Sequence, residues 1–239
     1  MATNLILSGG VAHDFPATSA ALAEVLAEVG VESTVTEDIA GALRERPAVD
    51  LITVNALRCH GDDGWSAAQG GSVFRLHPVA RAALLDHVER GGGVLAMHSA
   101  SICFDDWPYW YHMLGATWRW GASYHPPLGD VEVHLQGDDP LVSGLEDFTL
   151  FDEVYTDLVL LPGIRPLAVS QGQPLLWTRQ MGRGRLVYDA LGHDTRSYDS
   201  DSHRTLLRRA ALWLLGQAPS RRAEADSWAS LRSTSKTLP

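Results

Sequence analysis

The segment Gly93-Val94-Leu95-Ala96-Met97-His98-Ser99-Ala100 decides the fold class of this chain. Residues 94–97 form a short, uninterrupted apolar run, which is typical of a parallel strand buried on both faces. The glycines at 91–93 end a helix that we expect over residues 79–90. The small residues after His98 indicate a sharp turn from strand into helix, which holds the histidine side chain at the edge of the sheet.

The rest of the N-terminal half alternates strands and helices around this segment. Strands are expected at residues 5–8, 31–36 and 49–54, and a helix at 18–29. Strands that alternate with helices in this way form a mostly parallel sheet with helices on both faces. The sequence therefore predicts an α/β fold.

The C-terminal half is less regular. Strands are expected there at 130–135, 148–155, 166–170, 174–178 and 185–190, and helices at 107–114 and 203–215. We expect residues 1–216 to form one domain and residues 217–239 to form an extended or partly disordered tail anchored by Trp228. The loop at 56–75, which contains Trp65, has a length that is often functional.

The composition indicates a globular protein of a reducing compartment. Hydrophobic residues make up 45% of the 239 residues, and Cys59 and Cys103 are too few for a disulfide framework. No signal peptide and no apolar run of membrane-spanning length is present in the sequence. The net charge of −10 argues against nucleic acid or an anionic membrane as a partner. We expect a cytoplasmic protein with a small-molecule partner, and the sequence leaves open whether it forms a homo-oligomer.

Open α/β sheets bind ligands outside the carboxyl ends of their strands, so the residues after each expected strand are candidates for the site. Histidines follow three of these strands, and with Glu153 they are the expected catalytic residues: His13, His98 and His193. The same edge carries polar residues that we expect to bind substrate: Asp14, Asn55, Arg58, Ser99 and Asp194. Each histidine also has a structural interpretation as a loop or core residue, and Asp14 could instead cap a turn.

Glu153 lies in the apolar stretch Phe151-Asp152-Glu153-Val154-Tyr155. Neighbouring residues on a strand point to opposite faces, so we expect only one of the two carboxylates, at 152 or 153, to face the site. Burial among aromatic rings would raise the pKa of Glu153, which suits general acid–base catalysis. The alternatives are a capped turn or a salt bridge to an arginine. Asp152 is kept as a candidate for substrate binding.

Aromatic residues are dense between positions 104 and 124. Aromatic faces stack on sugar rings, so we expect Trp107, Trp110 and Tyr124 to contribute to a carbohydrate site. The alternative is that these rings belong to the core or to a subunit interface. His125 closes the segment and is a further candidate for the same pocket.

Several motifs occur in a fixed order along the chain, at residues 9–15, 93–100, 139–145, 152–155, 182–188 and 191–193. Together they resemble the trehalose-utilisation (ThuA-like) family over about residues 4–216. The resemblance implies a flavodoxin-like fold similar to that of class I glutamine amidotransferases. It also implies a role in the use of trehalose and related disaccharides, including their 3-keto derivatives.

Class I amidotransferases carry a nucleophilic cysteine at the turn between strand and helix. The expected residue at that turn is His98 here, and the nearest cysteine, Cys103, lies five residues further on. A glutaminase mechanism has no nucleophile without a thiolate at the turn, so glutaminase activity is not expected.

Three functions remain open. The first is an enzyme that acts on a sugar or 3-keto-sugar by proton transfer through histidine and carboxylate groups. The second is a metal-assisted hydrolase, in which zinc would be bound by His98, His125, Glu153 and His193. The third is a non-catalytic module that senses sugars or acts as a scaffold.

Overall fold

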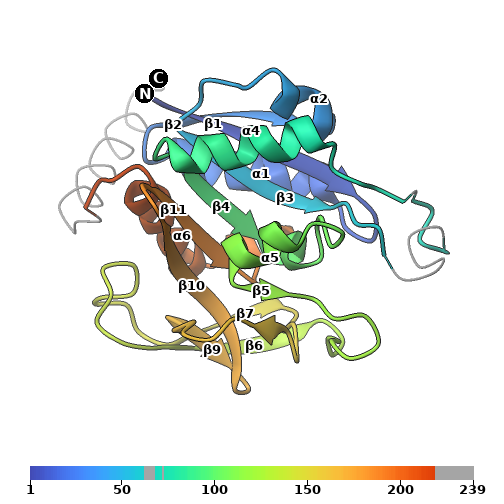
Figure 1. Cartoon of the computed structure of the whole chain (residues 1–239). Helices are drawn as coiled ribbons and strands as arrows, with labels where there is room; N and C mark the ends of the chain where they lie inside the picture. Colours follow the sequence, from blue (N-terminus) through green and yellow to red (C-terminus); the bar gives the residue numbers. More distant parts are fainter. Residues whose placement is uncertain (62–67, 72, 219–239) are drawn as a thin grey trace, which may run out of the picture.

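A computed structural model describes residues 1–61, 68–71 and 73–218 of the chain (Figure 1). In these residues a nine-stranded sheet has the order β2-β1-β3-β4-β11-β10-β9-β6-β7, and β5 pairs with β8. The strands are β1 (Ala2–Gly10), β2 (Val31–Thr36), β3 (Leu51–Leu57), β4 (Gly93–Met97), β5 (Ala116–Thr117), β6 (Gly129–Leu135), β7 (Phe148–Asp152), β8 (Val159–Leu160), β9 (Ala168–Ser170), β10 (Gln173–Met181) and β11 (Gly184–Asp189). The helices are α1 (Phe15–Ala27), α2 (Ile39–Arg44), α4 (Pro78–Glu89), α5 (Pro108–Leu114) and α6 (Asp201–Leu214), with the 3-10 helices η1 (His98–Ser101) and η2 (Thr195–Asp199).

The strands β2, β1, β3, β4 and β11 form the parallel half of the sheet. β3 and β4 are buried along their whole lengths, as a strand between two layers of helices requires. Because these strands run in one direction, their carboxyl ends meet at a single edge of the sheet. The segments that follow β1, β4 and β11 all leave the sheet at this edge, and they carry the expected histidines.

The strands β10, β9, β6 and β7 form the antiparallel half. The two halves join where a two-residue turn connects β10 to β11, with Gly182 at a φ of 61°. The expected α/β fold is confirmed, but a mostly parallel sheet is only partly right. Residue patterns predicted strands in the second half of the chain, and such patterns do not by themselves give strand direction.

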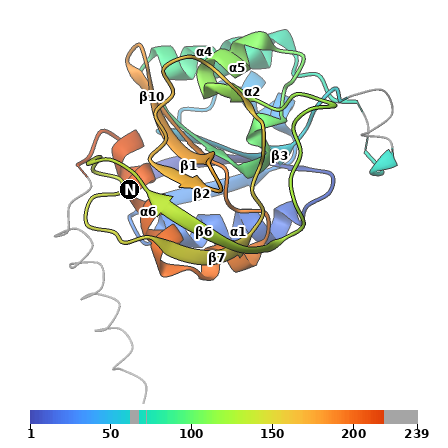
Figure 2. The same cartoon turned by 90° about the horizontal axis from the view of Figure 1, so that it is seen from below.

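Helices cover both faces of the parallel half, as expected. α2, α4 and α5 lie on one face, and α1 and α6 lie on the other (Figure 2). The short helix α2 is not indicated by the hydrophobic pattern. It begins where Asp38 Oδ1 accepts a hydrogen bond from the backbone N–H of Gly41 at 2.9 Å.

Some expectations fall outside the described residues. These are the state of residues 219–239, the anchoring role of Trp228, and the part of the 56–75 loop that contains Trp65. The division of the chain at residue 216 therefore stays a prediction. Among the described residues, no helix has the length and apolar character needed to cross a membrane.

Candidate active site

His98 directly follows β4 as the first residue of η1, at the turn where the chain leaves the carboxyl edge of the parallel half. Its φ of 40° is in the left-handed region, where a residue with a side chain is strained. Nδ1 of His98 lies 2.7 Å from the carbonyl oxygen of Ala190, and the hydroxyl of Tyr188 donates to the carbonyl oxygen of His98 at 2.8 Å. The contact with Ala190 places the proton on Nδ1, so in the neutral ring Nε2 carries a free lone pair.

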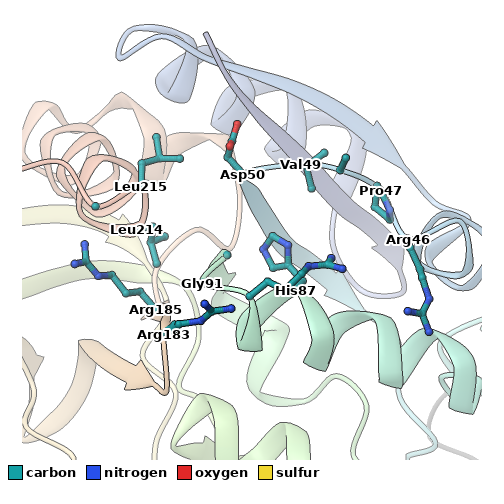
Figure 3. A pocket seen from close by; sticks show the side chains of 14 residues that line it. Arg46, Pro47, Val49, Asp50, His87, Gly91, Arg183, Arg185, Leu214 and Leu215 are labelled. Atoms are coloured by element: carbon teal, nitrogen blue, oxygen red, sulfur yellow. The ribbon is translucent and has the colours of Figure 1, made fainter.

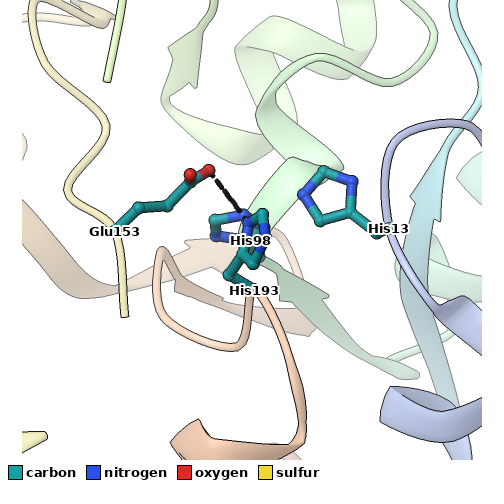
Figure 4. A group of neighbouring side chains, drawn as sticks. All are labelled: His13, His98, Glu153 and His193. Atoms are coloured by element: carbon teal, nitrogen blue, oxygen red, sulfur yellow. Dashed lines mark ion pairs between the residues drawn. The ribbon is translucent and has the colours of Figure 1, made fainter. Parts of the chain in front are cut away.

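His13 and His193 meet His98 from the segments that follow β1 and β11 (Figure 4). The ring centroid of His13 is 5.1 Å from that of His98 and 4.5 Å from that of His193. The rings of His98 and His193 are 5.4 Å apart. Three histidines separated by up to 180 positions therefore share one site, because their strands end at one edge.

The carboxylate of Glu153 comes to this site from the antiparallel half, one residue after β7. Its Oε1 lies 3.2 Å from Nε2 of His98 and 3.2 Å from Nδ1 of His193. Its Oε2 lies 2.9 Å from Nδ1 of His125, on the other side of the carboxylate. The side chain of Glu153 is only 3% exposed, so a single buried carboxylate contacts three imidazoles.

Asp152 does not join the cluster but holds its backbone in place. Its Oδ1 accepts hydrogen bonds from the backbone N–H groups of Glu153 at 2.8 Å and His193 at 3.2 Å. Its Oδ2 accepts a hydrogen bond from the backbone N–H of Gly192 at 2.8 Å. One buried carboxylate thus ties the end of β7 to the loop after β11.

Four potential ligand atoms, one each from His13, His98, Glu153 and His193, lie within 4.8 Å of one another. Among the described residues, three buried ring nitrogens make no hydrogen bond: Nε2 of His13, Nε2 of His98 and Nδ1 of His193. Nε2 of His98 and Nδ1 of His193 lie at ion-pair distance from Glu153 but without hydrogen-bond geometry. Each unpaired buried polar atom costs about 1–3 kcal/mol of folding free energy. The three unpaired nitrogens therefore make the folded protein less stable than paired ones would.

The charges in the cluster depend on one another. Burial alone would raise the pKa of Glu153, but His125, His193 and His98 lower it by more, and the net pKa lies far below the usual range. The expected raised pKa is therefore wrong, because neighbouring imidazoles outweigh the apolar surroundings. Burial, then His98 and His193, lower the pKa of His13 to about 3.

The pKa values of His98 and His125, which both contact the carboxylate, shift the other way. Burial lowers the pKa of His98, but Glu153 and Asp152 outweigh burial and the net shift is upward. The pKa of His125 is raised mainly by its hydrogen bond to Glu153. Both upward shifts have the same cause, because the negative charge of Glu153 favours the protonated imidazole.

Aromatic rings line the side of the cluster that His125 occupies. Tyr155 packs on His98 with ring centroids 4.4 Å apart, and Trp118 lies 5.1 Å from Tyr155 and 6.3 Å from His125. Trp118 lies in the aromatic-rich stretch for which a carbohydrate site was expected, but Tyr155 was not expected as a site residue. Tyr155 could have been found, because it lies two positions after Glu153 and residues at that spacing share a side of an extended segment.

A family model described as trehalose utilisation matches residues 4–214 of the chain. The chain belongs to the ThuA family. Membership indicates a carbohydrate-related role in trehalose utilisation. Comparison with curated proteins gives no match.

Solved structures show the same fold as this ThuA-family chain at low sequence identity. A putative ThuA-like protein from Parabacteroides merdae is 18% identical, with a TM-score of 0.74 over 92% of this chain and 92% of that chain. A cytoplasmic protein from Salmonella typhimurium is 12% identical, with a TM-score of 0.63 over 90% of this chain and 99% of that chain. A β-galactosidase from Bacillus circulans is 11% identical, with a TM-score of 0.58 over 91% of this chain but only 31% of that much longer chain.

Two of the expected substrate-binding residues of the ThuA-family chain are buried with their polar groups paired inside the protein. Nδ2 of Asn55 donates to the hydroxyls of Thr18 and Ser19 at 3.1 and 3.0 Å. The hydroxyl of Ser99 donates to the carbonyl oxygen of Ala56 at 2.8 Å. Asn55 thus ties β3 to α1, and Ser99 ties the start of η1 to β3.

Three other expected substrate-binding residues stabilise local structure. Asp14 caps α1 by accepting a hydrogen bond from the backbone N–H of Ala17 at 3.1 Å. Asp194 caps η2 and forms an ion pair with Arg196. Arg58 forms an ion pair with Glu37 at 3.4 Å. The structure gives each of them a protein partner.

The aromatic segment divides between core and surface. Trp110 is buried and its Nε1 donates to the carbonyl oxygen of Ala100 at 2.9 Å. Trp107 is also buried, with the guanidinium of Arg81 above its ring at 5.6 Å. Tyr124, which precedes His125, is 55% exposed. The core interpretation holds for the first two rings, and an exposed aromatic surface remains at Tyr124.

The two thiols are poorly suited to nucleophilic catalysis. Burial and then Asp105 raise the pKa of Cys59 to about 12, and burial raises the pKa of Cys103 further. Sγ of Cys103 donates to the carbonyl oxygen of Ala56 at 2.8 Å. Both thiols therefore stay protonated near neutral pH.

A hollow of about 680 Å³ lies at the opposite edge of the sheet, near the amino ends of the parallel strands (Figure 3). Arginine side chains line it, but protein groups already engage two of them: Nε of Arg183 donates to the carbonyl oxygen of Glu89, and Arg185 donates to that of Trp213. The histidine cluster is at the other edge, so this hollow is separate from the candidate site.

Proposed function

We propose that the chain is an enzyme that acts on a sugar or 3-keto-sugar, a disaccharide or glycoside, at the cluster of His13, His98, Glu153 and His193. One observation carries the proposal: three unpaired imidazole nitrogens converge with a buried carboxylate at a strained turn. Proteins tolerate such unfavourable groups chiefly at functional sites. The trehalose-utilisation family supports a carbohydrate as the substrate class.

The chemistry follows from the ketone. A ketone at C3 acidifies the neighbouring C2–H, and loss of that proton moves an electron pair onto the ketone oxygen as an enolate. When the ketone re-forms, the C1–O bond breaks and the glycosidic oxygen leaves with a proton. Water then adds across the C1–C2 double bond, so the net reaction is hydrolysis of the glycoside.

His125 is the group we assign to proton transfer. Its Nδ1 lies 2.9 Å from Oε2 of Glu153 and 3.1 Å from the carbonyl oxygen of Pro126, so Nε2 is left as the basic atom, in the way that a carboxylate orients a catalytic imidazole. Its side chain is 46% exposed, whereas those of His98 and Glu153 are almost fully buried. The imidazoles of the buried cluster would stabilise the negative charge on the enolate oxygen, because low solvent access makes electrostatic effects strong there.

A metal-assisted hydrolase is the second candidate, favoured by the four ligand atoms that converge at the cluster. In that reaction water attacks C1 directly and the C2–H bond is never broken. The absence of an available thiolate supports the proposal that the chain is not a glutaminase. We also propose a cytoplasmic location, the one carried in the names of two structural neighbours.

The test is to incubate the protein with a 3-keto-disaccharide in D2O and follow the products by NMR. Elimination and hydration place deuterium at C2 of the released 3-keto-sugar, whereas direct hydrolysis leaves C2 protonated. We expect deuterium at C2, and His125→Asn should slow its incorporation by about 10²–10⁴-fold. The control is His134→Asn, which removes an exposed histidine paired with Asp147.

Each other outcome selects a different function. Cleavage without deuterium at C2 would favour the metal-assisted hydrolase. Binding of the keto-sugar with neither exchange nor cleavage would indicate a sensing or scaffold module. Equal rates in wild type and His125→Asn would remove His125 from the mechanism.

A further inference from the structure

We infer that His13, His98, His193 and Glu153 bind one divalent first-row transition metal ion, with Zn²⁺ as the reference ion. The inference goes beyond the proposed function, because proton transfer at a keto-sugar does not by itself require a metal. It differs from the ligand set expected from the sequence in one residue, with His13 in place of His125.

The distances fit a common ion. With metal–ligand bonds of about 2.0–2.1 Å, ligand atoms in a tetrahedral site are about 3.3–3.4 Å apart. Oε1 of Glu153 is 3.2 Å from Nε2 of His98 and 3.2 Å from Nδ1 of His193. All four ligand atoms lie within 4.8 Å of one another, so a small rotation of the furthest side chain brings all four within bonding distance of one ion.

The ring orientations also fit. A histidine that binds a metal through one nitrogen usually donates the other N–H to a carbonyl or carboxylate oxygen. Nδ1 of His98 lies 2.7 Å from the carbonyl oxygen of Ala190, and Nδ1 of His13 lies 3.3 Å from that of Val11. Both contacts direct Nε2 of the same ring into the cluster.

The other buried histidines show that unpaired nitrogens are not the rule in this fold. Nε2 of His203 pairs with Asp189 at 3.1 Å, and its Nδ1 lies 2.9 Å from the carbonyl oxygen of Ser197. Nε2 of His87 lies 2.9 Å from the carbonyl oxygen of Gly93. Only in the cluster, among the described residues, do ring nitrogens from three different histidines converge without a hydrogen bond. A cation would accept all of their lone pairs at once.

His125 lies outside the ligand set but touches it. Its Nδ1 binds the second oxygen of Glu153, so it orients the carboxylate and leaves Oε1 for the ion. Groups in this position commonly change metal affinity by about 10–100-fold. His125→Asn should therefore weaken the metal without changing the number of ions bound.

The experiment measures metal binding without any sugar. Protein prepared without a polyhistidine tag is stripped with a chelator and titrated with Zn²⁺ by calorimetry, and with Co²⁺ to follow its visible absorption. We expect one ion per chain in the wild type and in His134→Asn. Glu153→Gln and His193→Asn should each weaken binding by more than 100-fold, and His125→Asn by about 10–100-fold.

His193→Asn covers the case in which a buried substitution prevents folding, because His193 lies in a loop and is 18% exposed. The inference is overturned if the folded wild type takes up no ion, or if the cluster variants bind it as tightly as His134→Asn. The two proposals fail separately. A protein that binds one ion but leaves the keto-sugar unchanged would keep this inference and refute the proposed function, and exchange at C2 by a folded protein that takes up no ion would do the reverse.

Discussion

The two halves of the sheet supply the site by different routes. The parallel half provides three histidines through one geometric rule, since each follows a strand that ends at the same edge. The antiparallel half provides Glu153, for which no such rule applies. Successive antiparallel pairings from β11 through β10, β9 and β6 return β7 to the direction of the parallel strands, so its carboxyl end also faces that edge.

Direction alone does not bring Glu153 to His98. β7 stands five places from β4 in the sheet, which in a flat sheet is about 24 Å. The observed distance of 3.2 Å requires the antiparallel half to curl back over the edge, as twisted sheets do. The parallel half therefore fixes where the site is, and the curl of the antiparallel half brings the negative charge of Glu153 to it.

The largest effect is expected from removing that charge. Glu153→Gln keeps the shape of the side chain but leaves His98, His125 and His193 without a carboxylate. We expect deuterium incorporation into the 3-keto-sugar to fall by about 10³–10⁴-fold. Glu132→Gln, on the exposed side of β6, is the matched control. If Glu153→Gln kept a tenth of the wild-type rate, the antiparallel half would not supply an essential group.

The second-largest effect is expected on stability, from a buried His203–Asp189 pair that belongs to the parallel half alone. The pKa of His203 is lowered by burial but raised by more by the Asp189 carboxylate, so its net pKa is raised. His203→Gln removes one partner of a buried charge pair, which costs about 3–5 kcal/mol.

The effect of His203→Gln depends on pH. A raised folded-state pKa gives stability that is complete below the unfolded pKa of about 6.5 and is lost as pH rises through the folded value. The difference in melting temperature between wild type and His203→Gln should thus be largest near pH 6 and smaller at pH 9. A difference that grows with pH would show that His203 is neutral in the folded protein.

The third effect concerns the link between the halves. Asp152→Asn replaces a carboxylate that accepts three backbone hydrogen bonds with an amide that has one acceptor oxygen. We expect unfolding in urea to require about 1.5–3 kcal/mol less free energy than in the wild type. Asp147→Asn, at an exposed ion pair, should change stability by no more than about 0.5 kcal/mol. Equal stability of the two variants would mean that Asp152 does not hold the halves together.

The smallest effect is expected from the thiols beside the turn. Replacement of Cys59 and Cys103 by Ser should leave deuterium incorporation unchanged and lower stability by about 1 kcal/mol. Glutamine hydrolysis should be undetectable in the wild type and in the variant. Glutaminase activity that disappears with Cys103→Ser would overturn the assignment of His98 to the turn residue.

The sequence by itself determined the α/β class, the three histidines at the edge of the parallel half and, except for α2, the approximate positions of the strands and helices of that half. These follow from local periodicity and from one topological rule, and both act over short stretches of chain. The ThuA resemblance also came from motifs within the sequence. Side-chain direction was less predictable: Asn55 and Ser99 follow or end strands at the right edge but turn inward, since nearby hydroxyl and carbonyl groups bind them.

Only the tertiary structure decided the chemistry of the site. The sequence predicted a Glu153 with a raised pKa among aromatic rings, whereas the folded protein surrounds it with imidazoles and lowers its pKa. The folded protein also gives the two neighbouring carboxylates different roles: Glu153 joins the cluster, and Asp152 holds the backbone. The physical reason is range: secondary structure depends on neighbours in sequence, but a pKa or a shared ligand depends on groups that the curl of the sheet brings from distant parts of the chain.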